Sequence, residues 1–209
     1  QLQKYPEQVK DELRVFLGNH PQFKEIEDYL PTQKAKALDG ANLELKEHQK
    51  AALKALEAMR DNSETIALLY HATGTGKTTT AVLDAKRCGG RVLFIAHTQE
   101  LVDQATKRFR ELWINTTVGR YCDVVKQPRA HVVCGSVQSV ALHLEDFKDD
   151  DFDYLIVDEA HHAAADTYQK VLSYFKPSFT LGLTATPERA DDKSILDIFK
   201  NTAHKLDIQ

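Results

Sequence analysis

The segment 65–78, TIALLYHATGTGKT, constrains this chain more than any other part of it. An apolar, β-prone run leads into a loop that is punctuated by Gly74 and Gly76 and ends in Lys77 and Thr78. A polyphosphate must be met by several backbone N–H groups at once, and glycine allows the tight turn and the close approach. Lys77 then supplies a positive charge for the phosphates, and Thr78 supplies a hydroxyl for Mg²⁺. The segment therefore predicts a strand, a phosphate-binding loop and the first turn of a helix.

One position of the loop departs from the usual pattern, because His71 stands where a small residue is usual. A flexible turn without a ligand is disfavoured, since strand, loop and helix follow one another in the order that the motif requires. The residues predicted to contact the phosphates are Thr73, Gly74, Thr75, Gly76, Lys77, Thr78 and Thr79.

Length and composition allow one α/β domain with some additional structure. The chain has 209 residues, 42% of them hydrophobic and 28% charged, and no apolar stretch approaches the roughly 18–20 residues of a membrane span. Cys88, Cys122 and Cys134 are scattered, which disfavours a disulfide framework or a zinc site and fits a reducing cytosol. The net charge of −4 does not favour nucleic acid, so any such contact must be local. We expect a soluble, cytoplasmic protein with no membrane association.

The sequence pattern divides the chain into two parts. Residues 1–40 are typical of a helical accessory segment or linker, in which apolar residues between Val9 and Leu17 share one helical face. Because the chain begins with Gln1 rather than Met, we expect it to be an excised fragment. Residues 41–209 are expected to form the nucleotide-binding domain.

Gln49 lies in the first turns of a predicted helix, Leu45 to Arg60, and outside its apolar face. A surface glutamine is usually only solvated, but this one precedes the phosphate loop in the same domain. A glutamine amide can accept from the adenine N6 amine and donate to N7, so one side chain can select adenine. We therefore predict that Gln49 recognises adenine and that the nucleotide is ATP.

Two further predicted strands, 92–96 and 131–134, are followed by small polar residues. Ligands of an open α/β sheet bind at the carboxyl ends of its strands. Thr98 also fits the N-cap of a helix, and capping alone is an alternative to a phosphate contact there. The residues placed at these two strand ends are Thr98, Gln99, Ser136 and Gln138.

The apolar run 154–157 delivers Asp158 and Glu159 to the tip of a strand. A carboxylate beside the phosphate loop can hold Mg²⁺ through its waters, and Glu159 can orient and partly deprotonate an attacking water. Such a pair favours hydrolysis over binding alone. His161 and His162 raise the alternative of a zinc site, which is disfavoured because no matching cysteine or carboxylate set lies nearby.

Three segments complete the pattern. The acidic run from Glu145 to Asp153 is expected to be a solvated connection. A fifth strand, 179–183, runs into Thr184 and Thr186, whose hydroxyls either join the nucleotide site to a second ligand or form a turn and a helix cap. The spacing of apolar residues from Ile195 to Phe199 predicts an amphipathic helix.

The ordered set of motifs resembles superfamily 2 helicases and translocases of the DEAD/DEAH-box type, specifically their first RecA-like domain. The resemblance covers about residues 43–200. The matching segments are Leu45–Gln49 for the adenine-reading motif, Ala72–Thr78 for motif I, Ala96–Leu101 for motif Ia, Gly135–Ser139 for motif Ib, Asp158–His161 for motif II and Thr184–Pro187 for motif III.

The resemblance implies an α/β fold: a RecA-like P-loop domain, whose parallel sheet has helices on both faces and binds ATP and Mg²⁺ at the strand ends. The Thr-Ala-Thr-Pro and Asp-Glu-Ala-His-His-Ala spellings resemble the motors of type I and type III restriction subunits and of repair translocases. That branch implies duplex DNA as partner, together with nuclease or specificity domains or subunits. The implied roles are catalytic for Lys77, Asp158, Glu159 and His161, coupling for Thr184 and Thr186, Mg²⁺ binding for Thr78 and Asp158, and nucleic-acid contact for Thr98, Gln99, Ser136 and Gln138.

The second RecA-like domain of this family, with its arginine finger, is not among these 209 residues. Because an arginine finger contributes about 10³–10⁵ in rate in related phosphoryl transfers, we expect the isolated chain to hydrolyse ATP weakly. Two alternatives stay open at this point. One is a DEAH-type RNA helicase, and the other is a nucleic-acid-sensing module that uses ATP as a conformational switch.

Overall fold

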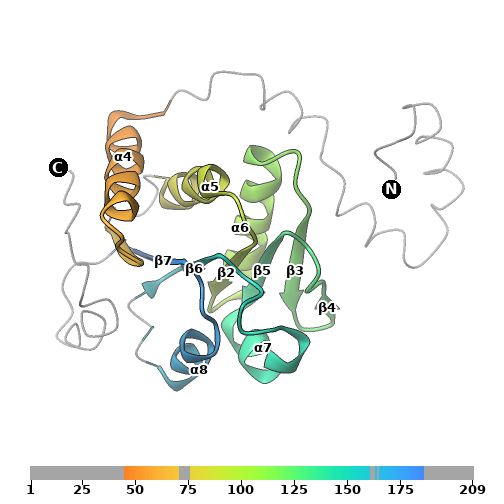
Figure 1. Ribbon diagram of the computed structural model, residues 1–209. Coiled ribbons are helices and arrows are strands. Elements are labelled where there is room, and N and C mark those ends of the chain that lie inside the picture. Colours follow the sequence, from red (N-terminus) through yellow and green to blue (C-terminus); the bar gives the residue numbers. More distant parts are fainter. Residues whose placement is uncertain (1–44, 71–75, 161–162, 164, 186–209) are drawn as a thin grey trace, which may run out of the picture.

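The computed structural model describes residues 45–70, 76–160, 163 and 165–185 (Figure 1). The accessory segment predicted at 1–40 and the helix predicted from Ile195 to Phe199 lie outside the described residues. Within the described part of the chain, no helix is both long and apolar enough to cross a bilayer.

Seven strands of the described chain form one sheet in the order β1-β7-β6-β2-β5-β3-β4. All neighbouring pairs are parallel except β3 and β4, which form an antiparallel hairpin. The predicted parallel α/β architecture is therefore confirmed. The strands are β1 (Ile66–Tyr70), β2 (Val92–Ala96), β3 (Val118–Cys122), β4 (Val125–Lys126), β5 (Val132–Ser136), β6 (Tyr154–Val157) and β7 (Phe179–Thr184).

Helices cover both faces of this sheet (Figure 1). Buried residues of α4, α5 and α6 pack with Phe94 and Leu181 on one face, whereas α7 and α8 pack with Leu93 and Val157 on the other. The helices are α4 (Glu47–Asp61), α5 (Lys77–Cys88), α6 (Gln99–Leu112), α7 (Val137–Leu142) and α8 (Asp166–Tyr174), with a 3₁₀ turn, η2 (Leu144–Asp146).

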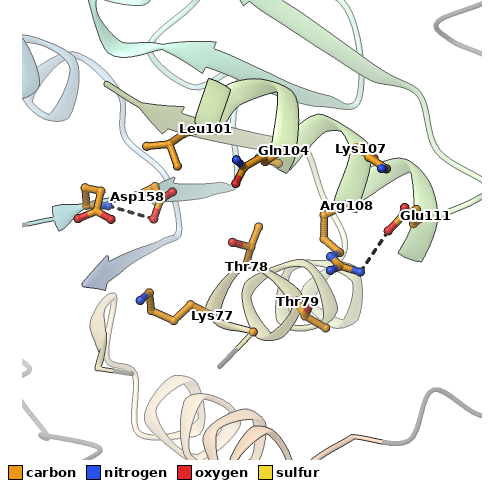
Figure 2. A pocket seen from close by; sticks show the side chains of 12 residues that line it. Lys77, Thr78, Thr79, Leu101, Gln104, Lys107, Arg108, Glu111 and Asp158 are labelled. Atoms are coloured by element: carbon orange, nitrogen blue, oxygen red, sulfur yellow. Dashed lines mark hydrogen bonds and ion pairs between the residues drawn. The ribbon is translucent and has the colours of Figure 1, made fainter. Parts of the chain in front are cut away.

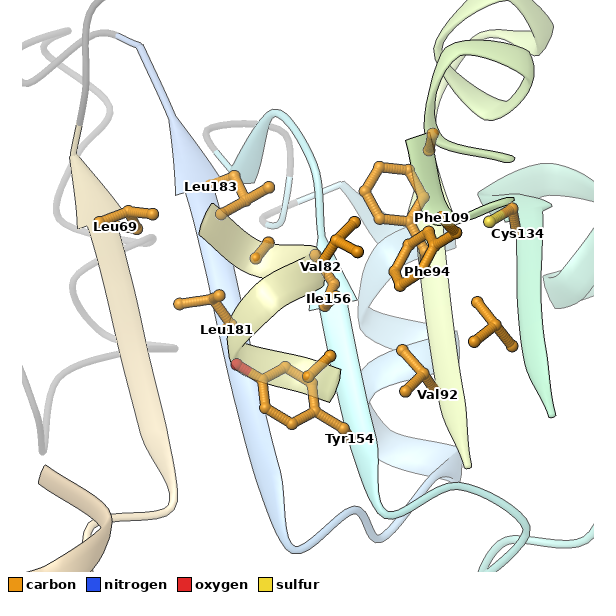
Figure 3. Close-up of a cluster of buried hydrophobic side chains, with 14 of the residues drawn as sticks. Leu69, Val82, Val92, Phe94, Phe109, Cys134, Tyr154, Ile156, Leu181 and Leu183 are labelled. Atoms are coloured by element: carbon orange, nitrogen blue, oxygen red, sulfur yellow. The ribbon is translucent and has the colours of Figure 1, made fainter. Parts of the chain in front are cut away.

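The central strand β2 shows why an uninterrupted apolar run predicts a strand here. All five of its residues are buried, because Val92, Phe94 and Ala96 face one layer of helices and Leu93 and Ile95 face the other. Figure 3 shows Val92 and Phe94 beside Ile156 of β6 and Phe109 of α6. A strand covered on both sides has no need for alternating polar residues.

The β3–β4 hairpin is not predicted by the sequence pattern. Gly119 and Arg120 interrupt the apolar residues of β3, so the segment does not resemble a buried strand. Gly119 is required by close packing, since a Cβ atom there would lie 2.7 Å from the carbonyl oxygen of Gln127 and 2.8 Å from the Cβ of Ala130. The hairpin adds an edge to the sheet beside β5.

The acidic connection from Glu145 to Asp153 is solvated as expected at Glu145, Asp146, Asp150 and Asp153, which are exposed, but it also packs on the core. Phe147 and Phe152 within it are buried, and their ring centroids lie 5.7 Å apart. The carboxylate of Asp153 accepts a hydrogen bond of 2.8 Å from the backbone N–H of Arg91. The alternation of acidic and aromatic residues therefore reflects a connection that packs on the core and caps the start of β2.

The buried carboxylate of Asp84 in α5 links this helix to α4 and to β6. The guanidinium of Arg60 donates two hydrogen bonds, of 2.7 and 2.8 Å, to the carboxylate of Asp84, whose side chain has no exposed surface. The hydroxyl of Tyr154 donates to the same carboxylate at 2.6 Å. Arg60 also lies 5.1 Å from the ring centroid of Phe179 in β7. Asp84 is thus satisfied by partners from two other elements.

Replacing Asp84 by Ala should lower the free energy of unfolding by about 3–5 kcal/mol, because it leaves the buried Tyr154 hydroxyl and the half-buried Arg60 guanidinium without their acceptor. Urea unfolding followed by circular dichroism measures this change. Glu47→Gln is the control, since it removes an exposed ion pair with Lys50 and should leave stability nearly unchanged. Equal stabilities of the two variants would contradict a structural role for the network.

Candidate functional site

The register of the sheet brings the predicted motifs to one edge. Tyr70 pairs with Thr184, which places the end of β1, before the phosphate loop, beside the end of β7. Ile95 of β2 pairs with Val157, the residue before Asp158. On its other side, Ala96 of β2 pairs with Ser136. Residues from five distant parts of the chain therefore meet at the carboxyl ends of the parallel strands.

Gly76 ends the phosphate loop and precedes α5. Its backbone φ of +91° lies in the left-handed region that glycine adopts without strain. A Cβ atom at this position would lie 2.5 Å from Nε2 of Gln49, so the absence of a side chain is also a steric requirement. α5 thus begins directly after Gly76, and the first backbone N–H groups of such a helix can bind an anion.

Gln49 contacts the end of this loop, but it is buried rather than exposed as the sequence suggested. Its side chain amide donates to the carbonyl oxygen of Gly76 at 3.5 Å and accepts from the backbone N–H of Lys46 at 3.1 Å. Only 7% of the residue is exposed. The first turn of α4 packs close to Gly76, so Gln49 can be buried while both ends of its amide are hydrogen-bonded.

A cavity of about 450 Å³ lies between the start of α5, the tip of β6 and one face of α6 (Figure 2). It contains the predicted residues Lys77, Thr78, Asp158 and Glu159, so the lysine and threonine at the end of the phosphate-loop motif share one site with the carboxylate pair. The residues that line it are Gly76, Lys77, Thr78, Thr79, Leu101, Gln104, Ala105, Lys107, Arg108, Glu111, Asp158 and Glu159.

The contribution of α6 to this cavity is the part that sequence reasoning missed. Figure 2 shows Arg108 across from Thr79, paired with Glu111 at 3.1 Å. Gln104 lies on the same wall. The helical spacing i, i+3, i+4 and i+7 from Leu101 places 104, 105 and 108 on one face, and this signal could have identified them.

Charged groups in the cavity are partly withdrawn from water. Burial lowers the pKa of Lys77, and the carboxylates of Glu159 and Asp158 act in the opposite direction. Burial raises the pKa of Asp158 from 3.8 to about 6, although the backbone N–H of Glu159 donates to its Oδ1 at 3.0 Å. A cation placed beside Asp158 would offset this penalty.

Glu159 has a left-handed backbone, with a φ of +51°. Residues other than glycine adopt this conformation rarely, and such strain is found preferentially at functional sites. The sharp turn directly after β6 lets Asp158 and Glu159 both line the cavity although they are adjacent in the chain.

The oxygen atoms at the site fit Mg²⁺ bound together with a nucleotide. Thr78 and Asp158 offer a hydroxyl and a carboxylate, which are ligands that Mg²⁺ prefers. Among the described residues, no group of three or more His, Cys, Asp or Glu side chains could hold a metal by itself. The remaining ligands would be phosphate oxygens and waters, as is usual for Mg²⁺ in nucleotide sites.

The residues predicted to contact nucleic acid lie at the ends of β2 and β5. Thr98 caps α6 by accepting from the backbone N–H of Leu101 at 3.3 Å, and Ser136 is buried and caps α7. Gln99 and Gln138 are exposed. Thr184 is buried at the tip of β7. The predicted residues Thr73, Gly74, Thr75, His161 and Thr186 lie outside the described part of the chain.

Asp158 should destabilise the folded protein at neutral pH when nucleotide and divalent cation are absent. Its folded pKa of about 6 exceeds the ordinary 3.8, so the folded state binds more protons in this interval and stability falls as pH rises through it. Asp158→Asn should therefore raise the free energy of unfolding by about 1–3 kcal/mol at pH 7 and by much less at pH 4. Urea unfolding across this range measures the difference, with exposed Asp150→Asn as control. A difference between Asp158→Asn and wild type that does not vary with pH would contradict this origin.

Comparison with known proteins agrees with this geometry. Residues 42–189 match the family described as "Type III restriction enzyme, res subunit". The EcoAI type I restriction endonuclease subunit of Escherichia coli is 31% identical over 176 residues, which are 77% of this chain and 22% of that protein. IRC3 of Saccharomyces cerevisiae is 33% identical over 114 residues, which are 49% of this chain and 16% of IRC3. The chain thus spans about a fifth of the length of these relatives.

The fold also matches solved structures. The helicase domain of Hef from Pyrococcus furiosus superposes with a TM-score of 0.64 at 22% identity, over 78% of this chain and 37% of that one. The SWI2/SNF2 ATPase core of Sulfolobus solfataricus gives a TM-score of 0.62 at 18% identity, over 78% of this chain and 36% of that one. Sequence match, fold and motif order together show that the chain belongs to the family of the type III restriction enzyme res subunit, within helicase superfamily 2.

Proposed function

We propose that this chain is the first RecA-like domain, and the ATP-binding half, of a nucleic-acid-dependent ATPase that moves along or separates duplex DNA. The observation that supports it best is the shared cavity, in which a phosphate-loop lysine and threonine face an Asp-Glu pair from another strand. A binding protein needs only the first pair, whereas hydrolysis also requires a group that activates water.

Each residue has a role that follows from its place. Lys77 and the N-terminus of α5 bind the β- and γ-phosphates, and the cavity withdraws them from bulk water. Thr78 and Asp158 would hold Mg²⁺, which would neutralise charge on the phosphates. Glu159 accepts a proton from the attacking water and aligns it with the γ-phosphate. His161 is proposed to link this pair to a second domain.

Gln49 is proposed to recognise adenine from the first turn of α4. Its amide already bonds Lys46 and Gly76. The amide oxygen has a second lone pair and the nitrogen a second N–H, so the side chain retains one acceptor and one donor for the N6 and N7 edge. Adenine bound in this way would be tied to the phosphate loop through Gly76.

Duplex DNA is the proposed partner. The restriction subunit of Escherichia coli is named as an endonuclease, and a relative from Halobacterium salinarum, 33% identical over 127 residues, is named as a DNA 3'-5' helicase. An Acanthamoeba polyphaga mimivirus relative, 30% identical over 125 residues, is instead named as an RNA helicase. We propose that Thr98, Gln99, Ser136 and Gln138 lie along the nucleic-acid path, and that Thr184 and Thr186 couple this path to the ATP site.

A second RecA-like domain and an attached nuclease or specificity module are proposed as partners. The chain covers 22% of the EcoAI subunit, so that protein has room for both. A second domain would complete the site with an arginine that stabilises charge on the γ-phosphate.

In the protein that also contains the second RecA-like domain, replacing Glu159 by Gln should lower ATP turnover by at least about 100-fold while ATP affinity stays close to that of wild type, because only water activation is lost. Glu111→Gln is the matched control, since it removes a carboxylate from the other wall of the same cavity. Steady-state phosphate release and fluorescent-nucleotide titration measure the two quantities. Unchanged turnover in Glu159→Gln would refute the assigned role.

The same assay separates the candidate partners. In the protein that also contains the second RecA-like domain, stimulation of wild-type turnover by duplex DNA, and not by RNA of equal length at the same salt concentration, is the expected result. Stimulation by RNA alone would favour the RNA helicase. ATP binding with no turnover under any condition, in a protein that contains the second domain, would favour a switch.

A further inference from the structure

We propose that Asp123, in the turn between β3 and β4, is a positioning residue that holds Gln99 and Ser139 together on the nucleic-acid path. The inference rests on the proposed function, because Gln99 and the segment from Gly135 to Ser139 are the parts expected to meet nucleic acid. It adds an element of the fold, the β3–β4 hairpin, that the motif pattern does not contain.

The contacts of Asp123 connect the two motifs directly. Its carboxylate accepts a hydrogen bond from the side chain amide of Gln99, the first residue of α6. Its backbone N–H donates to Oγ of Ser139 at 3.3 Å. Ser139 Oγ in turn accepts from the hydroxyl of Ser136 at 2.9 Å. A continuous chain of hydrogen bonds therefore runs from the start of α6 to the start of α7.

The backbone at Asp123 is specialised for this position. Its φ of +46° lies in the left-handed region, which Asp and Asn adopt more readily than other residues with a side chain. It occupies a two-residue turn, Asp123–Val124, between antiparallel strands. A strained backbone conformation persists only where surrounding contacts hold it in place. At Asp123, the hydrogen bonds to Gln99 and Ser139 are such contacts.

The hairpin that carries Asp123 is fixed to α6 at two further points. Arg120 of β3 forms an ion pair of 2.6 Å with Asp103. Arg110 donates to the carbonyl oxygen of Val118 at 3.1 Å. These two contacts fix the position of the turn beside the first residue of α6. Asp123 can therefore restrict the Gln99 side chain to one rotamer.

Restriction of Gln99 matters because its side chain is exposed and long. Ordering a flexible side chain on binding costs affinity, so a side chain held in place beforehand binds more tightly. The charge of Asp123 alone would have the opposite effect, because a carboxylate repels phosphates. A positional role and a purely electrostatic one therefore predict changes of opposite sign when the side chain is removed.

Asp123→Gly and Asp123→Asn form the test pair, because both residues accept a positive φ and only Asn keeps an acceptor for Gln99. Binding of the purified protein to a labelled duplex DNA is measured by fluorescence anisotropy over a series of salt concentrations. Asp123→Gly should bind about three- to tenfold more weakly, with an unchanged salt slope because no cation is lost. Asp123→Asn should bind at least as tightly as wild type.

Ser63→Gly is the control for added backbone freedom, since Ser63 also has a positive φ, of 63°, and lies in the turn between α4 and β1. It should bind DNA as wild type does. Equal affinities of Asp123→Gly and wild type, or equal weakness of Asp123→Gly and Asp123→Asn, would overturn the inference while leaving the proposed function intact. If wild type binds neither duplex DNA nor RNA, the proposed function fails and this inference fails with it.

Discussion

The parallel pairing of β2 with β5 and β6 is the constraint on which the rest of the structure depends. β2 is buried on both faces, so its position is fixed by packing above and below and by backbone hydrogen bonds on both edges. A shift of one residue would turn Phe94 into the layer now occupied by Ile95 and misplace the strand tips together. The alignment of the three strands therefore determines where Asp158, Thr98 and Ser136 meet.

The same edge concentrates groups whose charges are costly to bury. Burial shifts the pKa values of Lys77 and Asp158 toward their neutral forms, and shifts of this kind cluster at functional sites. The proposed ATP–Mg²⁺ ligand would supply anionic phosphates for the lysine and a cation for the carboxylate. Its binding would thus offset the cost of burying these two charges in the free protein.

Much of this could be predicted, because the segments that form the site obey local rules. The strands 92–96 and 154–157 are continuous apolar runs, and the residues after them have the chemistry of phosphate and metal binding. β3 could not be predicted, because Gly119 and Arg120 do not fit the pattern of a buried strand. Only tertiary contacts explain them: close packing around Gly119 and the ion pair of Arg120 with Asp103 in α6.

Two features of the site also escaped prediction for reasons of packing. The burial of Gln49 depends on how closely α4 approaches Gly76, which no periodicity in α4 reveals. The cavity wall formed by Gln104 and Arg108 depends on the crossing of α5 and α6. In both cases a polar residue that looks solvated along its own helix lies against a distant segment of the chain, with Gln49 bonded to Gly76 and with Gln104 and Arg108 lining a cavity shared with α5 and β6.

α4 is bonded to α5 at both of its ends, and this has a mechanical consequence. Gln49 in its first turn bonds Gly76, and Arg60 in its last turn holds Asp84 through two hydrogen bonds. The start of α4 is thereby bonded to Gly76, directly before α5, and the end of α4 is bonded to Asp84 within α5. Under the proposed function, this would keep a fixed distance between the residue assigned to adenine and the start of α5. A change of that distance during a cycle of nucleotide binding and hydrolysis would have to break the ion pair between Arg60 and Asp84.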